Sequence, residues 1–108
     1  KKLCNIGNIQ LLAELYKKDI IKEKTIDEIL TLLLDNTSPE KIQTESPEYI
    51  INNIDSLFKL ISIIYKKNNK FITDNMEIFK ERSKNKIYPP KSRFIFMDIL
   101  DIHKKLKL

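Results

Sequence analysis

Residues 47–67 read PEYIINNIDSLFKLISIIYKK, and their apolar residues recur at the spacing of one helix face. This row consists of Ile50, Ile54, Leu57, Phe58, Ile61, Ile64 and Tyr65. Ser46 offers a hydroxyl that caps the first turn, and Pro47 is tolerated there because its missing N–H would be unpaired anyway. Further apolar residues widen the row. We therefore expect a central helix that neighbouring helices cover on two sides.

Helical spacing of apolar residues recurs before and after this segment. Besides the central helix, the pattern predicts four helices. The first covers about 5–18, the second runs from a capping box at Thr25 and Glu28 to 35–36, another covers about 71–82, and the last begins near Lys91. Polar residues and prolines predict loops over 36–46 and 83–92. No strand-like alternation occurs. About five helices in pairs predict an all-α fold, and a stacked α-solenoid in particular, because no pair buries both of its faces alone.

Composition indicates an ordinary globular domain. Hydrophobic residues make up 42% of the 108 residues and charged residues 32%. Lysine far outnumbers arginine, and together with the many Ile and Asn residues this indicates codon bias, which weakens any direct argument from lysine to nucleic acid. Cys4 is the lone cysteine, so an intrachain disulfide and the usual zinc spacings are excluded. No apolar run approaches the roughly 20 residues of a membrane span, and a chain that opens on Lys1 is expected to be part of a longer polypeptide.

The net charge of +5 comes from the last quarter of the chain. Residues 80–108 carry nine basic residues against three acidic ones, whereas residues 1–79 are nearly balanced. The candidate partner-binding or RNA-binding residues are Lys84, Lys86, Tyr88, Lys91 and Arg93. Three interpretations stay open for this segment: a solvated loop, contact with RNA phosphates, or contact with an acidic protein.

Two aromatic residues flank the basic segment. Tyr88 and Phe94 have rings that are able to stack on bases. For Phe94 we expect burial instead, at the point where the last helix meets the preceding pair.

The sequence offers few candidates for catalytic residues. His103 is the only histidine, so histidine-based metal sites and catalytic triads lack partners, and we expect it at the surface. Asp98 and Asp101 share a helix face, where local pairing with Lys104 or Lys105 is the expected role. With one glycine there is no glycine-rich phosphate loop. We predict a protein that is not an enzyme and uses no metal or cofactor.

Two motifs carry a family resemblance. Residues 6–16 read IGNIQLLAELY, and residues 92–102 read SRFIFMDILDI. The first resembles the Gly-Asn-Ile-Arg helix of the middle domain of eukaryotic translation initiation factor 4 gamma, and the second resembles that family's Ser-Arg-Ile-Arg-Phe-Met segment. Gln10 stands where the family usually has a basic residue. The resemblance covers residues 1–108 and corresponds to the C-terminal part of the middle domain, as a single domain fragment.

The resemblance implies a stack of HEAT-like antiparallel helix hairpins that acts as a cytoplasmic scaffold in translation initiation. The implied partners are a DEAD-box RNA helicase of the initiation factor 4A type and, through basic surface, mRNA, with no membrane and a monomeric state. Two alternatives stay open: an RNA-binding helical module of a related adaptor in mRNA metabolism (nonsense-mediated decay, nuclear cap binding or poly(A)-binding-protein adaptors), and a purely structural end of a larger solenoid.

Overall fold

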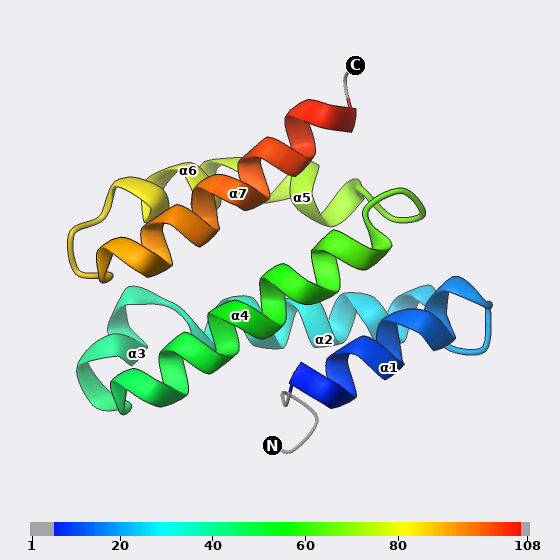
Figure 1. The fold of residues 1–108 in the computed structure, drawn as a ribbon, viewed down its shortest axis with the longest axis horizontal. Helices are drawn as coiled ribbons and strands as arrows, with labels where there is room; N and C mark the ends of the chain where they lie inside the picture. Colours follow the sequence, from blue (N-terminus) through cyan, green and yellow to red (C-terminus); the bar gives the residue numbers. More distant parts are fainter. Residues whose placement is uncertain (1–5, 107–108) are drawn as a thin grey trace.

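The computed structural model describes residues 6–106, which form seven helices and no strand (Figure 1). These are α1 (Ile6–Lys17), α2 (Glu23–Asn36), α3 (Pro39–Thr44), α4 (Pro47–Ile64), α5 (Lys70–Asp74), α6 (Met76–Lys84) and α7 (Pro90–Leu106). The all-helical prediction is confirmed for this part of the chain. Cys4 lies outside the described residues.

The helices form two layers. α1, α4 and α7 lie side by side in one layer, and α2 and α6 lie behind them (Figure 1). The molecule measures 37 × 35 × 18 Å, and its shortest dimension is about that of two stacked helices. The HEAT-like solenoid stays a prediction, because one two-layered unit does not establish a repeat.

α4 is the central helix, as its apolar row predicts. It packs against α1 and α7 within its layer and against α2 behind it. Its predicted cap is also present, since the Ser46 hydroxyl accepts a hydrogen bond of 3.1 Å from the Tyr49 N–H. The buried side chains of α4 are Ile50, Asn53, Ile54, Ser56, Leu57, Leu60, Ile61 and Ile64.

The predicted capping box of the second helix is wrong. α2 begins at Glu23, and the N-cap position is occupied by Lys22, three residues before Thr25, without a side-chain hydrogen bond. The N–H groups of Thr25 and Ile26 both donate to the Lys22 carbonyl, at 3.1 and 3.3 Å. Thr25 therefore lies inside the first turn and cannot cap it.

The prediction of about five helices is too low. The expected loop over 36–46 contains α3, which starts at Pro39 after an extended Ser38. The expected helix over 71–82 is divided into α5 and α6 at Asn75, whose side-chain amide donates to the Phe71 carbonyl at 2.8 Å. An asparagine that bonds the preceding turn in this way competes with the backbone and interrupts the helix.

The turn between α1 and α2 is held to the far end of α4. Asp19 has a φ of 64°, and the N–H of Ile20 donates to the Leu15 carbonyl at 2.9 Å, which is the hydrogen bond of a Schellman motif. The Lys67 ammonium donates to the Tyr16 carbonyl at 2.7 Å and also pairs with Asp19. This contact fixes the ends of α1 and α4 relative to each other.

α7 buries most of the apolar face that its spacing predicts, with Phe96, Ile99 and Ile102 in the core, but two of its residues differ from expectation. Phe94 is 61% exposed, whereas His103 is 8% exposed and its Nδ1 has no hydrogen-bond partner among residues 6–106. Both predictions are wrong for the same reason. α7 packs against α6 as well as α4. His103 lies four residues after Ile99 and seven after Phe96, so it shares their buried face, whereas Phe94 lies two residues before Phe96 and on the other side of the helix.

Candidate partner-binding surface

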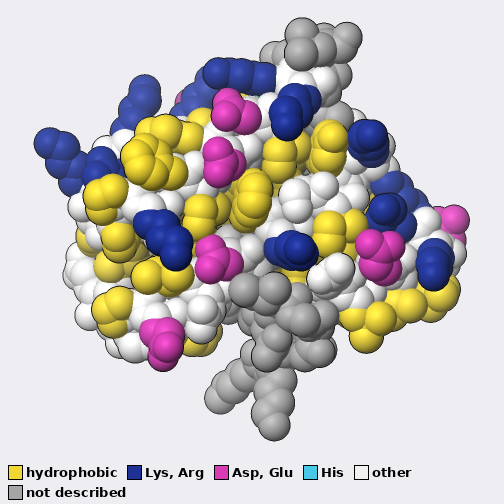
Figure 2. Space-filling model, in the orientation of Figure 1, with side chains coloured by type: hydrophobic (Ala, Val, Ile, Leu, Met, Phe, Trp, Pro, Cys, Tyr) yellow, Lys and Arg dark blue, Asp and Glu magenta, His cyan; other side chains and the backbone are white. Residues whose placement is uncertain are grey.

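Three of the five predicted site residues are exposed lysines at one end of the molecule. Lys84 ends α6, Lys86 lies in the loop that follows, and Lys91 lies in the first turn of α7. Figure 2 shows Lys and Arg side chains spread over one face of the molecule, with hydrophobic and acidic side chains between them. We call Lys84, Lys86 and Lys91 the basic rim.

Hydrogen bonds order the loop that carries the basic rim. The Asn85 side-chain oxygen accepts from the Ile87 N–H at 3.0 Å, and the Asn85 carbonyl accepts from the Tyr88 N–H at 3.2 Å. α7 then starts with the Arg93 N–H donating to the Pro89 carbonyl at 3.1 Å. The lysines are therefore attached to an ordered backbone, which lowers the entropy cost of binding a partner.

Tyr88 is not available to stack on a base, so this part of the site prediction is wrong. Its side chain is 1% exposed, and its hydroxyl donates to the Thr37 carbonyl at 2.6 Å. Its ring packs edge-on against Phe96, with 5.1 Å between the ring centroids. Burial raises the pKa of Tyr88 to about 12. Tyr88 holds the loop against the end of α2 and does not face a partner.

Arg82, from the same basic segment, is also buried. Its Nη1 donates to the Leu34 carbonyl at 3.0 Å and to the Thr37 hydroxyl at 2.9 Å. Burial lowers the pKa of its guanidinium. The carbonyl end of α2 carries partial negative charge and so compensates the buried cation. Because Thr37 bonds both Arg82 and Tyr88, we call these three residues the Thr37 junction.

Arg93, the fifth predicted site residue, is half-buried near the start of α7. Its Nε is buried and has no hydrogen-bond partner within the described chain. The first turn of α7 contains no acidic residue. Lys91 and Arg93 therefore add to the positive end of the helix dipole, and that end attracts negative charge.

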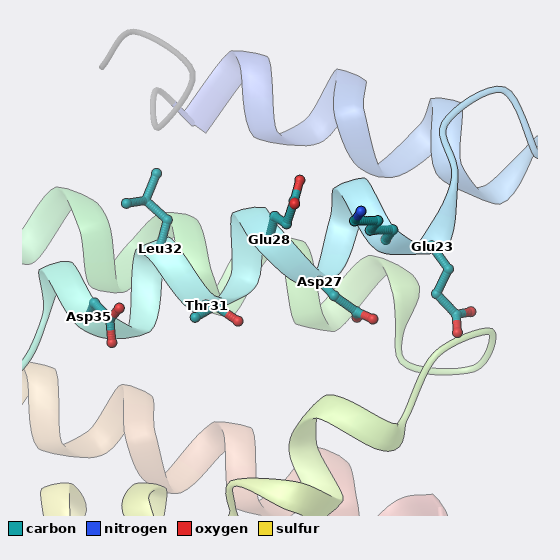
Figure 3. A pocket seen from close by; sticks show the side chains of 7 residues that line it. Glu23, Asp27, Glu28, Thr31, Leu32 and Asp35 are labelled. Atoms are coloured by element: carbon teal, nitrogen blue, oxygen red, sulfur yellow. The ribbon is translucent and has the colours of Figure 1, made fainter.

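A shallow surface depression of about 690 Å³ lies on α2. Its lining residues all come from α2, and their side chains extend along both sides of that helix without converging (Figure 3). Two of its acids have structural partners: Glu23 accepts from the Tyr16 hydroxyl at 3.0 Å and Asp27 accepts from the Asn68 amide at 3.1 Å. This surface does not have the arrangement of a catalytic or small-molecule site.

The local pairing expected for Asp101 is present, since its carboxylate lies 4.0 Å from the Lys104 ammonium. In residues 6–106, no three His, Cys, Asp or Glu side chains are grouped so that they could bind a metal ion. No helix in this range has the length and hydropathy needed to cross a membrane.

Comparison with known proteins finds two low-identity relatives. The chain is 29% identical over 104 residues to eukaryotic translation initiation factor 4G of Triticum aestivum, which covers 92% of the chain and 6% of that protein. It is 28% identical over 101 residues to a von Willebrand factor A domain-containing protein of Dictyostelium discoideum, which covers 90% of the chain and 4% of that protein. No family model matches the chain, and no solved structure matches it.

The chain therefore corresponds to a small part of both relatives. The wheat protein is of the family that residues 6–16 and 92–102 resemble, so the similarity supports a region like that of initiation factor 4G.

Proposed function

We propose that this chain is a non-catalytic, cytoplasmic scaffold region that acts in translation initiation by docking a DEAD-box RNA helicase of the initiation factor 4A type. The observation that carries the proposal is the similarity to wheat initiation factor 4G, which extends over 92% of the chain. In this role the chain holds the two lobes of the helicase in a productive orientation and supplies no catalytic group. It acts as a monomer and needs no cofactor.

The basic rim is the proposed contact. Lys84, Lys86 and Lys91 are exposed on an ordered loop and at the positive end of α7. Such a surface attracts an acidic partner over several ångströms and speeds the encounter. The buried Tyr88 and Arg82 contribute by holding the loop in place.

The test is an amide NMR titration of the labelled chain with the helicase, together with a charge-reversal variant. In the variant, Lys84, Lys86 and Lys91 are each replaced by Glu. The matched control reverses the three exposed lysines near the α1–α2 turn, Lys17, Lys18 and Lys22. We expect shifts that cluster around residues 84–94 and binding that only the basic-rim variant loses. Equal loss in both variants would show a general charge effect, and no shifts from folded chain at near-millimolar helicase would refute docking.

RNA contact is the second candidate, and the charge of residues 80–108 favours it. The affinity of an RNA-binding surface falls with salt, with a slope of about 0.7 for each phosphate contacted on a single strand. Binding of a single-stranded oligonucleotide should then weaken steeply between about 50 and 200 mM salt. Removing one rim lysine should lower the slope by about one contact.

A further inference from the structure

The outer side of α7 carries two exposed apolar side chains directly beside the basic rim. Phe94 is 61% exposed and Met97 is 42% exposed. Residues three apart are neighbours on a helix surface, so Lys91, Phe94 and Met97 form one continuous stripe from the rim outward. Aromatic residues and Met are enriched in protein–protein interfaces, whereas a polar surface needs neither.

The same stripe contains acidic residues, and these distinguish between classes of partner. Asp98 and Asp101 follow Phe94 by four and seven residues, and both are exposed. Asp101 is balanced by Lys104 at 4.0 Å. A nucleic acid whose base stacked on Phe94 would place phosphates beside these carboxylates, and like charges in contact are unfavourable. A protein partner avoids this repulsion if its acidic groups face the basic rim and none of them faces Asp98 or Asp101.

We propose that Phe94, supported by Met97, is the apolar anchor by which this chain binds an acidic protein partner. Its ring enters an apolar pocket of that partner while the basic rim faces the partner's carboxylates. The inference rests on the proposed function, because it assigns to the helicase the surface that Phe94 contacts. The inference adds Phe94, for which the sequence predicts burial, to the contact surface. In this arrangement the basic rim steers the partner during the encounter, and Phe94 supplies most of the affinity.

The experiment measures the dissociation constant of the helicase for the 108-residue chain and for two single variants. Phe94→Ala should weaken binding by about 30-fold, as truncation of a central interface aromatic does. The matched control is Leu11→Ala, which removes a side chain of nearly equal exposure, 59%, from α1. This control should bind like the wild type. Thermal melting of both variants checks that the fold is retained, which is expected since both side chains are largely exposed.

Three outcomes would overturn the inference, and the oligonucleotide result separates the second from the first. If wild type binds and Phe94→Ala binds equally well, the anchor is wrong while the helicase scaffold stands. If Phe94→Ala weakens binding of a single-stranded oligonucleotide and leaves helicase binding unchanged, Phe94 stacks on bases. If the folded wild-type chain does not bind the helicase at all, the proposed function fails and the inference fails with it.

Discussion

The Thr37 junction yields the sharpest prediction about stability. Arg82 reaches from α6 to the end of α2, where a single nitrogen makes hydrogen bonds of 3.0 Å to the Leu34 carbonyl and 2.9 Å to the Thr37 hydroxyl. Replacing Arg82 by Met keeps an unbranched side chain in the core and removes the charge and both bonds. The variant should unfold more easily for this reason.

The magnitude follows from two opposing effects. Each hydrogen bond from a charged donor contributes about 1.5–3 kcal/mol to the free energy of unfolding. Release of the buried guanidinium from its desolvation cost offsets part of that sum. A net loss of about 3 kcal/mol remains. With a urea m-value of about 2 kcal/mol/M for a small domain, the unfolding midpoint should fall by about 1.5 M.

The assay is urea unfolding followed by circular dichroism, with Lys84→Met as the matched control. Lys84 lies on the same helix and loses the same charge, but it is exposed, so its replacement should change the free energy of unfolding by less than about 0.5 kcal/mol. A double-mutant cycle of Arg82→Met with Thr37→Val should show a coupling energy of about 1 kcal/mol. If the two methionine variants unfold at the same urea concentration, the buried arginine is not stabilising and the reasoning is refuted.

Three further predictions concern contacts between distant parts of the chain. Tyr88→Phe removes the 2.6 Å bond to Thr37 and should lower the free energy of unfolding by about 1–2 kcal/mol in the same assay, whereas an unchanged midpoint would contradict that bond. Lys67→Met removes the bond to the Tyr16 carbonyl and should cost about 1 kcal/mol, against almost nothing for the exposed neighbour Lys66→Met. Burial, and for Tyr16 also the hydrogen bond to Glu23, raises the pKa of Tyr16 and of Tyr88 to about 12, above the value of 10.0 expected for an unfolded chain. The folded state therefore holds these two hydroxyl protons more tightly than the unfolded chain does. The contribution of the two tyrosines to the free energy of unfolding is complete below pH 10 and is lost between pH 10 and 12. An equal pH dependence of the melting curves of wild type and Tyr88→Phe would contradict this.

The local pattern of the sequence was sufficient for some elements and insufficient for others. α4 could be predicted because its cap and its apolar row are short-range features, and both are present in the structure. For α7, the apolar spacing predicts the burial of Phe96, Ile99 and Ile102, but it does not predict the exposure of Phe94. Residues 94–97 are four apolar residues in succession, and their hydrophobicity predicts burial for Phe94 as well as for Phe96. The contact with α6 buries Phe96 and leaves Phe94 exposed.

The candidate surface shows the same division. The exposure of Lys84, Lys86 and Lys91 follows from the cost of burying an ammonium group, and any loop of this composition would show it. Tyr88 and Arg82 belong to the same basic segment, yet they are buried. No local pattern predicts this burial, because the hydrogen-bond partners are distant in sequence. The partner of Tyr88 lies 51 residues earlier in the chain, and the two partners of Arg82 lie 48 and 45 residues earlier.

The sequence by itself thus determined the helical class, the central helix and the position of the positive charge. These depend on interactions between residues a few positions apart and on the solvation of charged groups. Only the tertiary structure decided which members of the basic segment face a partner and which apolar residue stands beside them. Which of these residues are buried depends on the position of the end of α2 relative to the α6–α7 loop. The packing of helices that are distant in sequence sets that position.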